Sequence, residues 1–140
     1  WEPILEPFRS HCLIERYYAA FNAGNGDGML ACLADDIAHD VNQGQRQHGK
    51  DAFRAFLAHM DRCYKERLSD IVIMANDAGT RAAAEFVVHG KYLATDEGLP
   101  EANGQTYLLP AGAYFDLAEG KIARVSVYYN LADWTRQVGG

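Results

Sequence analysis

A short polar run in the N-terminal half of the chain holds the residues best suited to acid–base chemistry. His39, Asp40 and Asn42 place an imidazole, a carboxylate and an amide close together, just ahead of Gly44. A carboxylate withdrawn from water holds its proton more tightly, so its pKa rises toward the range useful to a general base. We therefore predict that Asp40 is a general base in an apolar pocket. The alternative is a solvated carboxylate beside a turn.

The neighbours of Asp40 are candidate ligand contacts. Side chains alternate along a strand, so Asp40 and Asn42 are expected on one face and His39 on the other. Asn42 could orient Asp40 or bind a ligand oxygen, and it could equally be a turn-forming residue beside Gly44. We keep Asn42 and His39 as candidate substrate-binding residues, with His39 secondary.

A second polar pair lies on a later strand. Glu85 and His89 share one strand face with Ala83 and Val87, so this mixed face could form a polar pocket wall or could simply be solvated. Their spacing corresponds to roughly 13 Å along a strand, too far for a direct hydrogen bond. Each would need another partner.

The order of the expected elements is helices first and strands later, which predicts an α+β fold. Apolar residues recur at helical spacing in residues 7–23 and 50–64, and a short helix lies between them. The expected strands are residues 37–41, 71–74, 80–93, 105–117 and 122–130. We expect a curved, mostly antiparallel sheet covered on one face by three N-terminal helices. Such a cone has an apolar interior that opens at one end.

Composition limits the classes of function. The 140 residues are 49% hydrophobic and carry a net charge of −6, which fits one domain spanning residues 1–140 and argues against nucleic-acid binding. The apolar runs are shorter than the roughly 20 residues that span a bilayer, so we expect a cytoplasmic protein without membrane contact. Cys12, Cys32 and Cys63 share no metal-ligand spacing, and we expect neither a metal nor another cofactor.

The chain resembles the steroid delta-isomerase-like branch of the NTF2-like (SnoaL-like) superfamily. The resemblance rests on the polar run 39–44, its flanking segments, and the stretches 84–90 and 128–134, which are similar to ketosteroid isomerase-related proteins. It implies the cone-shaped α+β fold and a homodimer. It also implies that Asp40 is the general base and that Tyr17, which follows Arg16, donates a hydrogen bond to the oxyanion. Tyr129 falls where these enzymes have a pocket aromatic.

One position departs from the family pattern. Leu108 stands where ketosteroid isomerases have the acid of the oxyanion hole, and a leucine cannot donate a hydrogen bond. Three hypotheses therefore stay open: a cofactor-independent isomerase or lyase acting on a small apolar carbonyl compound, a non-catalytic module that binds such a ligand, and a dimeric interaction domain. The loop 95–104 is a candidate lid, dimer contact or exposed connector.

The strands also carry charged residues that a different enzyme of similar type could use. A limonene epoxide hydrolase-like mechanism would need an Asp–Arg–Asp arrangement on adjacent strands. Arg81, Arg124 and Asp116 permit this arrangement only loosely.

Overall fold

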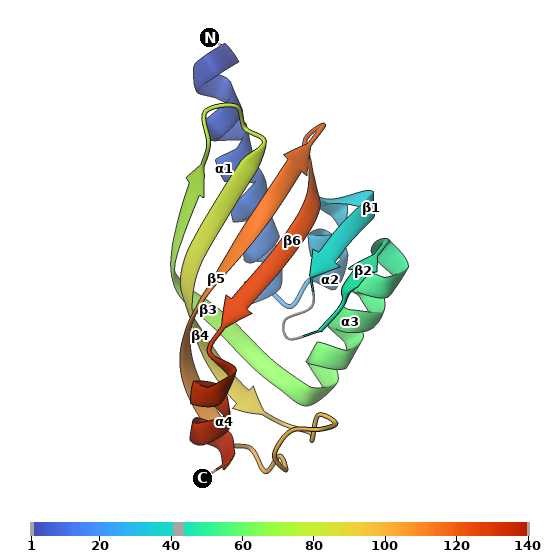
Figure 1. The fold of residues 1–140 in the computed structure, drawn as a ribbon, viewed down its shortest axis with the longest axis vertical. Coiled ribbons are helices and arrows are strands. Elements are labelled where there is room, and N and C mark those ends of the chain that lie inside the picture. The colour runs from blue at the N-terminus through green and yellow to red at the C-terminus, as the bar shows by residue number, and fades with distance from the viewer. Residues whose placement is uncertain (1, 41–43, 140) are drawn as a thin grey trace.

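A computed structural model describes residues 2–40 and 44–139 of the chain (Figure 1). The helices and strands are α1 (Glu2–Asn22), α2 (Gly26–Ala31), β1 (Leu33–Asp40), β2 (Arg46–His48), α3 (Lys50–Cys63), β3 (Tyr64–Ala75), β4 (Arg81–Tyr92), β5 (Thr106–Ala118), β6 (Lys121–Tyr129) and α4 (Leu131–Gly139). No described helix is long and apolar enough to cross a membrane.

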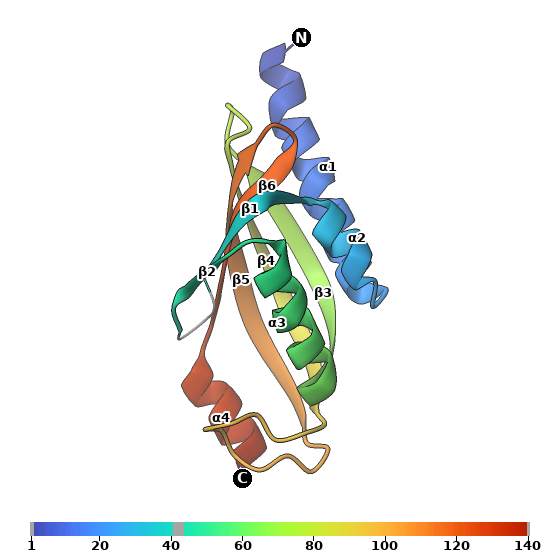
Figure 2. The same ribbon diagram turned by 90° about the vertical axis from the view of Figure 1, so that its right-hand side faces the viewer.

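The strands form one curved, mixed sheet in the order β2-β1-β6-β5-β4-β3. β1 runs parallel to β6, and the other neighbouring strands are antiparallel. Figure 2 shows α1, α2 and α3 on the same side of the sheet. We call the covered side the inner face and the opposite side the outer face. The predicted α+β fold, with an open sheet curved around its helices, is confirmed.

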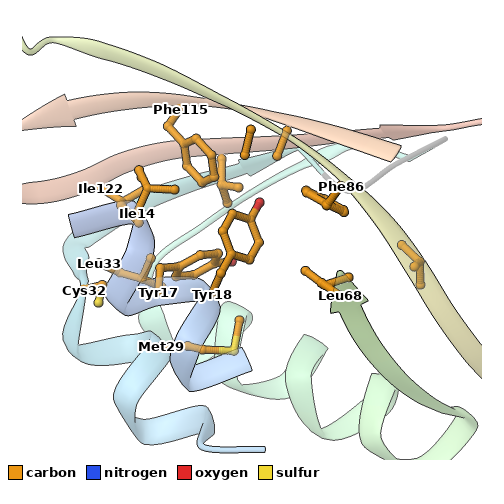
Figure 3. Packing of buried hydrophobic residues seen from close by; sticks show 14 of the residues in the cluster. Ile14, Tyr17, Tyr18, Met29, Cys32, Leu33, Leu68, Phe86, Phe115 and Ile122 are labelled. Atoms are coloured by element: carbon orange, nitrogen blue, oxygen red, sulfur yellow. The ribbon is translucent and has the colours of Figure 1, made fainter. Parts of the chain in front are cut away.

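The core lies between α1 and the inner face of the sheet. Ile14 and Tyr18 of α1 are buried against Phe115 of β5, which has no exposed surface. Figure 3 shows these side chains meeting between the helix and the strands. Along β4, the buried side chains alternate with more exposed ones, as expected for a strand with one covered face. This alternation decides which residues the inner face can offer to a ligand.

Two elements, β2 and α4, and the first half of β3 lie where the sequence predicted none. β3 begins at Tyr64, directly after α3 and well before residue 71, because its first half pairs with β4. The short strand β2 is fully exposed and has no hydrophobic pattern. The helix α4 covers the free edge of β5, where the amide of Gln137 binds both the N–H and the carbonyl of Leu108 at 2.9 Å.

Candidate functional site

Asp40 lies on the outer face of the sheet, at the end of β1. The Nε atom of Arg46 donates to Asp40 Oδ1 at 2.6 Å, and the hydroxyl of Ser126 donates to Asp40 Oδ2. The hydrogen bond from Arg46, and after it the one from Ser126, hold the pKa of Asp40 well below its usual range. The prediction of an apolar pocket that raises this pKa is therefore wrong, because the carboxylate has cationic and hydroxyl partners.

The ion pairs around Asp40 continue across three further strands, β6, β5 and β4. Arg124 Nη1 lies 3.7 Å from Asp40 Oδ2, and Arg124 Nε donates to Asp116 Oδ2 at 3.0 Å. Arg81 Nε lies 2.8 Å from Asp116 Oδ1. The structure thus brings Arg81, Arg124 and Asp116 together, with Arg124 between two carboxylates. The hydrogen bond from Arg124 lowers the pKa of Asp116, so both acids are charged at neutral pH.

Tyr17 lies in the core and not beside Asp40. Its ring packs edge-on against Tyr18 at 5.1 Å and Phe115 at 6.0 Å between ring centroids. The residue is 5% exposed, and burial raises the pKa of its hydroxyl. Because Tyr17 packs on the inner face and Asp40 on the outer face, the sheet separates the predicted donor from the predicted base.

Three further predicted site residues face outward. Glu85 is exposed, and His89 accompanies it on the outer face of β4, where the ring Nε2 lies 2.7 Å from the hydroxyl of Ser69. Leu108 pairs with His89 across the strands and is 54% exposed. The prediction of Leu108 at an interior site is wrong, because Tyr107 and Leu109 take the inward positions on either side of it. Asn42 lies outside the described residues.

His39 occupies the inner face, opposite to Asp40, as strand alternation predicts. Its ring packs against Phe53 and Phe56 of α3, with centroid distances of 4.8 and 4.5 Å. The residue is 4% exposed, and its Nδ1 atom has no hydrogen-bond partner among the described residues. Burial lowers the pKa of His39 to about 4, so the ring is neutral near pH 7.

The buried ring gives a testable pH dependence. The unfolded chain binds a proton at His39 near pH 6.5, whereas the folded protein does so only near pH 4. Between these values the unfolded state holds more protons, so this contribution to stability is lost as the pH falls. From pH 7 to pH 4 the free energy of unfolding should drop about 2–3 kcal/mol more in wild type than in His39→Gln. Urea titrations at several pH values measure the free energy of unfolding of both proteins. The same pH dependence in wild type and His39→Gln would contradict this prediction.

The inner face carries one acid that the sequence analysis did not select. Glu66 of β3 accepts a hydrogen bond from the Tyr107 hydroxyl, and burial raises the pKa of Glu66 despite this bond. Gly90 lies between them in the strand register, and a Cβ there would come within 2.0 Å of Tyr107 Cζ. The glycine therefore lets the Tyr107 ring cross β4 to reach Glu66.

Glu66 and Tyr107 also line a cavity. Its volume is about 750 Å³, in the range of small-molecule sites, and Gly90 contributes to the same wall. His89 and Leu108, which lie on the outer face, line the same cavity, as do the basic residues Lys65, Arg67 and Lys91. Alternation in residues 64–68, with Tyr64, Glu66 and Leu68 on one face, was the sequence signal that could have found Glu66.

An aromatic cluster packs beside Tyr107, the residue that donates a hydrogen bond to Glu66. Tyr64 stacks on Tyr92 at 5.4 Å, and Trp134 of α4 packs edge-on against Tyr92 at 5.0 Å and Tyr107 at 5.9 Å. The pKa of Tyr129 is raised, first by burial and then by the nearby charge of Glu66. The predicted pocket aromatic Tyr129 is thus partly buried and within range of the charge of Glu66.

Comparisons with known proteins place this arrangement in a family. The family model of the SnoaL-like domain matches residues 14–125. Three similar structures are each described as a "putative polyketide cyclase". The one from Pseudomonas putida KT2440 is 63% identical, with a TM-score of 0.91 over 92% of this chain and 97% of that one. The one from Silicibacter sp. TM1040 is 60% identical, with a TM-score of 0.92 over 94% and 96%. The one from Xanthomonas campestris pv. campestris is 57% identical, with a TM-score of 0.91 over 94% and 98%.

The fold and the matched segment define an NTF2-like α+β protein. This chain belongs to the SnoaL-like domain family. The superfamily predicted from the polar run 39–44 and its flanking segments is therefore confirmed. More distant structures, including a ketosteroid isomerase-like protein from Kribbella flavida at 16% identity, share the fold alone. No functionally curated protein matches the sequence.

Proposed function

We propose that this protein is an enzyme that removes a proton next to a carbonyl group of a small, mostly apolar ligand, with Glu66 as the base. The observation that carries the proposal is the partly buried carboxyl group of Glu66, whose pKa is raised by burial. A base of raised pKa accepts a proton from carbon more readily than an ion-paired carboxylate does. Asp40 is such an ion-paired carboxylate.

The proposed reaction needs a group that accepts the proton and a group that stabilises the enolate oxygen. Glu66 and its neighbours can supply both. The proton on carbon moves to the Glu66 carboxylate, and the electron pair it leaves shifts to the carbonyl oxygen as an enolate. Tyr129 is the proposed donor to that oxygen, because its phenol is protonated at neutral pH and its pKa responds to the charge of Glu66. Tyr107 holds Glu66 in position through its hydrogen bond.

The comparisons support this reaction class. A polyketide carries several carbonyl groups, and closing a ring between its carbons begins with removal of a proton beside one of them. The enolate carbon then attacks a second carbonyl. Return of the proton to a different carbon would instead give an isomerase. Both outcomes share the step assigned to Glu66, and neither requires a cofactor for that step.

Two alternatives make different predictions. The assignment of Asp40 as general base with Tyr17 as hydrogen-bond donor, implied by the family resemblance, requires a ligand to reach both sides of the sheet. A non-catalytic binding module would hold the same apolar ligand without exchanging its protons. The family resemblance motivated this second alternative, because Leu108 aligns with the acid of the oxyanion hole; in the structure Leu108 faces outward.

Hydrogen–deuterium exchange tests the proposed step without knowledge of the product. Apolar mono- and bicyclic ketones are incubated with the protein in deuterated water, and deuterium next to the carbonyl is followed by NMR. The proposal predicts protein-dependent exchange that saturates with ketone concentration. Saturable binding without exchange would favour the binding module, and neither binding nor exchange across the panel would contradict the proposal.

We also propose that the chain forms a homodimer through the outer face of the sheet. Val72, Met74, Tyr114 and Tyr128 are each at least half exposed there, and the rings of Tyr114 and Tyr128 lie 5.6 Å apart. Exposed apolar patches on a sheet face mark interaction sites. Sedimentation should show a dimer in wild type and a monomer in Tyr114→Glu, with Glu15→Gln, an exposed position on α1 away from the outer face, as the control. A monomeric wild-type protein would contradict this proposal.

A further inference from the structure

Three potential metal ligands meet where α3 ends and the loop between β4 and β5 begins. His59 and Cys63 are one helical turn apart on α3, so their side chains lie on one side of the helix. Asp96 comes from the loop 93–105. The ligand atoms of these three residues all lie within 4.8 Å of one another, and His59 Nε2 is 2.9 Å from Asp96 Oδ1.

We propose that His59, Cys63 and Asp96 bind a divalent metal ion of the zinc class. One nitrogen, one sulfur and one carboxylate oxygen form a donor set that Zn²⁺ uses, and three protein ligands leave one position for water. Metal–ligand bonds of roughly 2.0–2.3 Å require the three atoms to close in on a common centre by a small movement. The ion would take the place of the proton shared between His59 and Asp96. Two anionic ligands, the Cys63 thiolate and Asp96, balance its charge.

The surroundings support such a site and show what must move. Cys63 is 1% exposed, so its sulfur is shielded from solvent. The Tyr64 hydroxyl donates to Asp96 Oδ2 at 2.7 Å, which is how outer residues commonly orient a ligating carboxylate. Arg62 donates to His59 Nδ1 at 2.9 Å. Metal binding at Nε2 places the ring proton on Nδ1, so the exposed Arg62 side chain must turn away.

The ion would fasten the loop 93–105 to α3. The loop is already well connected, since Asp96 N–H donates to the Tyr92 hydroxyl at 2.9 Å and that hydroxyl donates to the Pro100 carbonyl at 2.7 Å. Linear spacing could not reveal the site, because Asp96 lies more than thirty residues after Cys63. In the competing explanation, the bonds from His59 and Tyr64 to Asp96 hold the loop without any ion.

Cobalt titration separates the two explanations. The full chain, reduced and stripped of metal with a chelator, is titrated with Co²⁺ near neutral pH. The proposal predicts one Co²⁺ per chain, a near-ultraviolet charge-transfer band from thiolate to cobalt, and bleaching of that band by Zn²⁺. It also predicts that Zn²⁺ raises the melting temperature. Absence of the band at saturating Co²⁺, in protein shown by circular dichroism to be folded, would overturn it.

Variants assign the band to the three residues. Cys63→Ser should abolish it, whereas Cys12→Ser, in a distant thiol on α1, should retain it. Because Cys63 is buried and its replacement can unfold the chain, the partly exposed His59→Gln provides a second test and should weaken binding at least tenfold. Tyr64→Phe should weaken it about 10–100-fold, as other outer-sphere changes do. Binding unchanged in His59→Gln and Asp96→Asn would overturn the assignment.

Discussion

Replacing Glu66 with glutamine is expected to lower the rate of ketone proton exchange by about 10²–10⁴-fold, the usual contribution of a general base. The glutamine keeps the shape of the side chain and can accept the Tyr107 hydrogen bond through its amide oxygen. The loss would therefore report the missing proton acceptor and not a disrupted inner face. Ketone binding measured by NMR titration should change little in the same variant.

Asp40→Asn is the matched comparison for Glu66→Gln. Asp40 is held by Arg46 and Ser126 on the outer face, so its amide variant should keep most of the exchange activity. Glu85→Gln, which alters an exposed acid on β4, controls for a change in overall charge. If Asp40→Asn abolished exchange and Glu66→Gln did not, the base would be Asp40, as the family resemblance implies.

Phe115→Ala is expected to lower the free energy of unfolding by about 3–5 kcal/mol, the usual cost of truncating a buried phenylalanine. Phe115 has no exposed surface and contacts the rings of both Tyr17 and Tyr18. The alanine would leave a cavity between α1 and the sheet at the point where the helix is anchored. A loss of this size is a large fraction of the stability of a typical domain, which is about 5–15 kcal/mol.

Urea denaturation measures the effect of Phe115→Ala as a fall in the transition midpoint at constant slope. Leu108→Ala is the control, because Leu108 is 54% exposed and its truncation should cost well under 1 kcal/mol. Equal losses in the two variants would show that the inner and outer faces have been assigned wrongly.

The fold could be predicted largely from local pattern. Helical spacing located α1 and α3, and β-branched and aromatic residues located β4, β5 and β6 within a few residues. The first half of β3 and the helix α4 were missed for a shared physical reason. Both owe their structure to neighbours: β3 to its pairing with β4, and α4 to the free edge of β5 and the packing of Trp134.

The candidate site was harder to predict. The alternation of side chains along a strand tells which residues share a face, but not which face the helices cover. Alternation correctly separated His39 from Asp40 and grouped Glu85 with His89. Only the position of the helices decides that His39 faces inward and the others outward. The main partner that lowers the pKa of Asp40 is Arg46, six residues later on β2, whose contact depends on the hairpin pairing of β1 with β2. Ser126 and Arg124 could not be found, because the parallel pairing of β1 with β6 brings them to Asp40.

We infer that the desolvated carboxyl group of this protein is Glu66 and not Asp40. Carboxyl-detected NMR titration of the free protein tests it most directly, with Glu66→Gln and Asp40→Asn identifying the two signals. We predict a Glu66 pKa above its ordinary value of 4.5 and an Asp40 pKa below its ordinary value of 3.8. A Glu66 pKa at or below 4.5, together with an Asp40 pKa raised above 3.8, would contradict this assignment and return the site to Asp40.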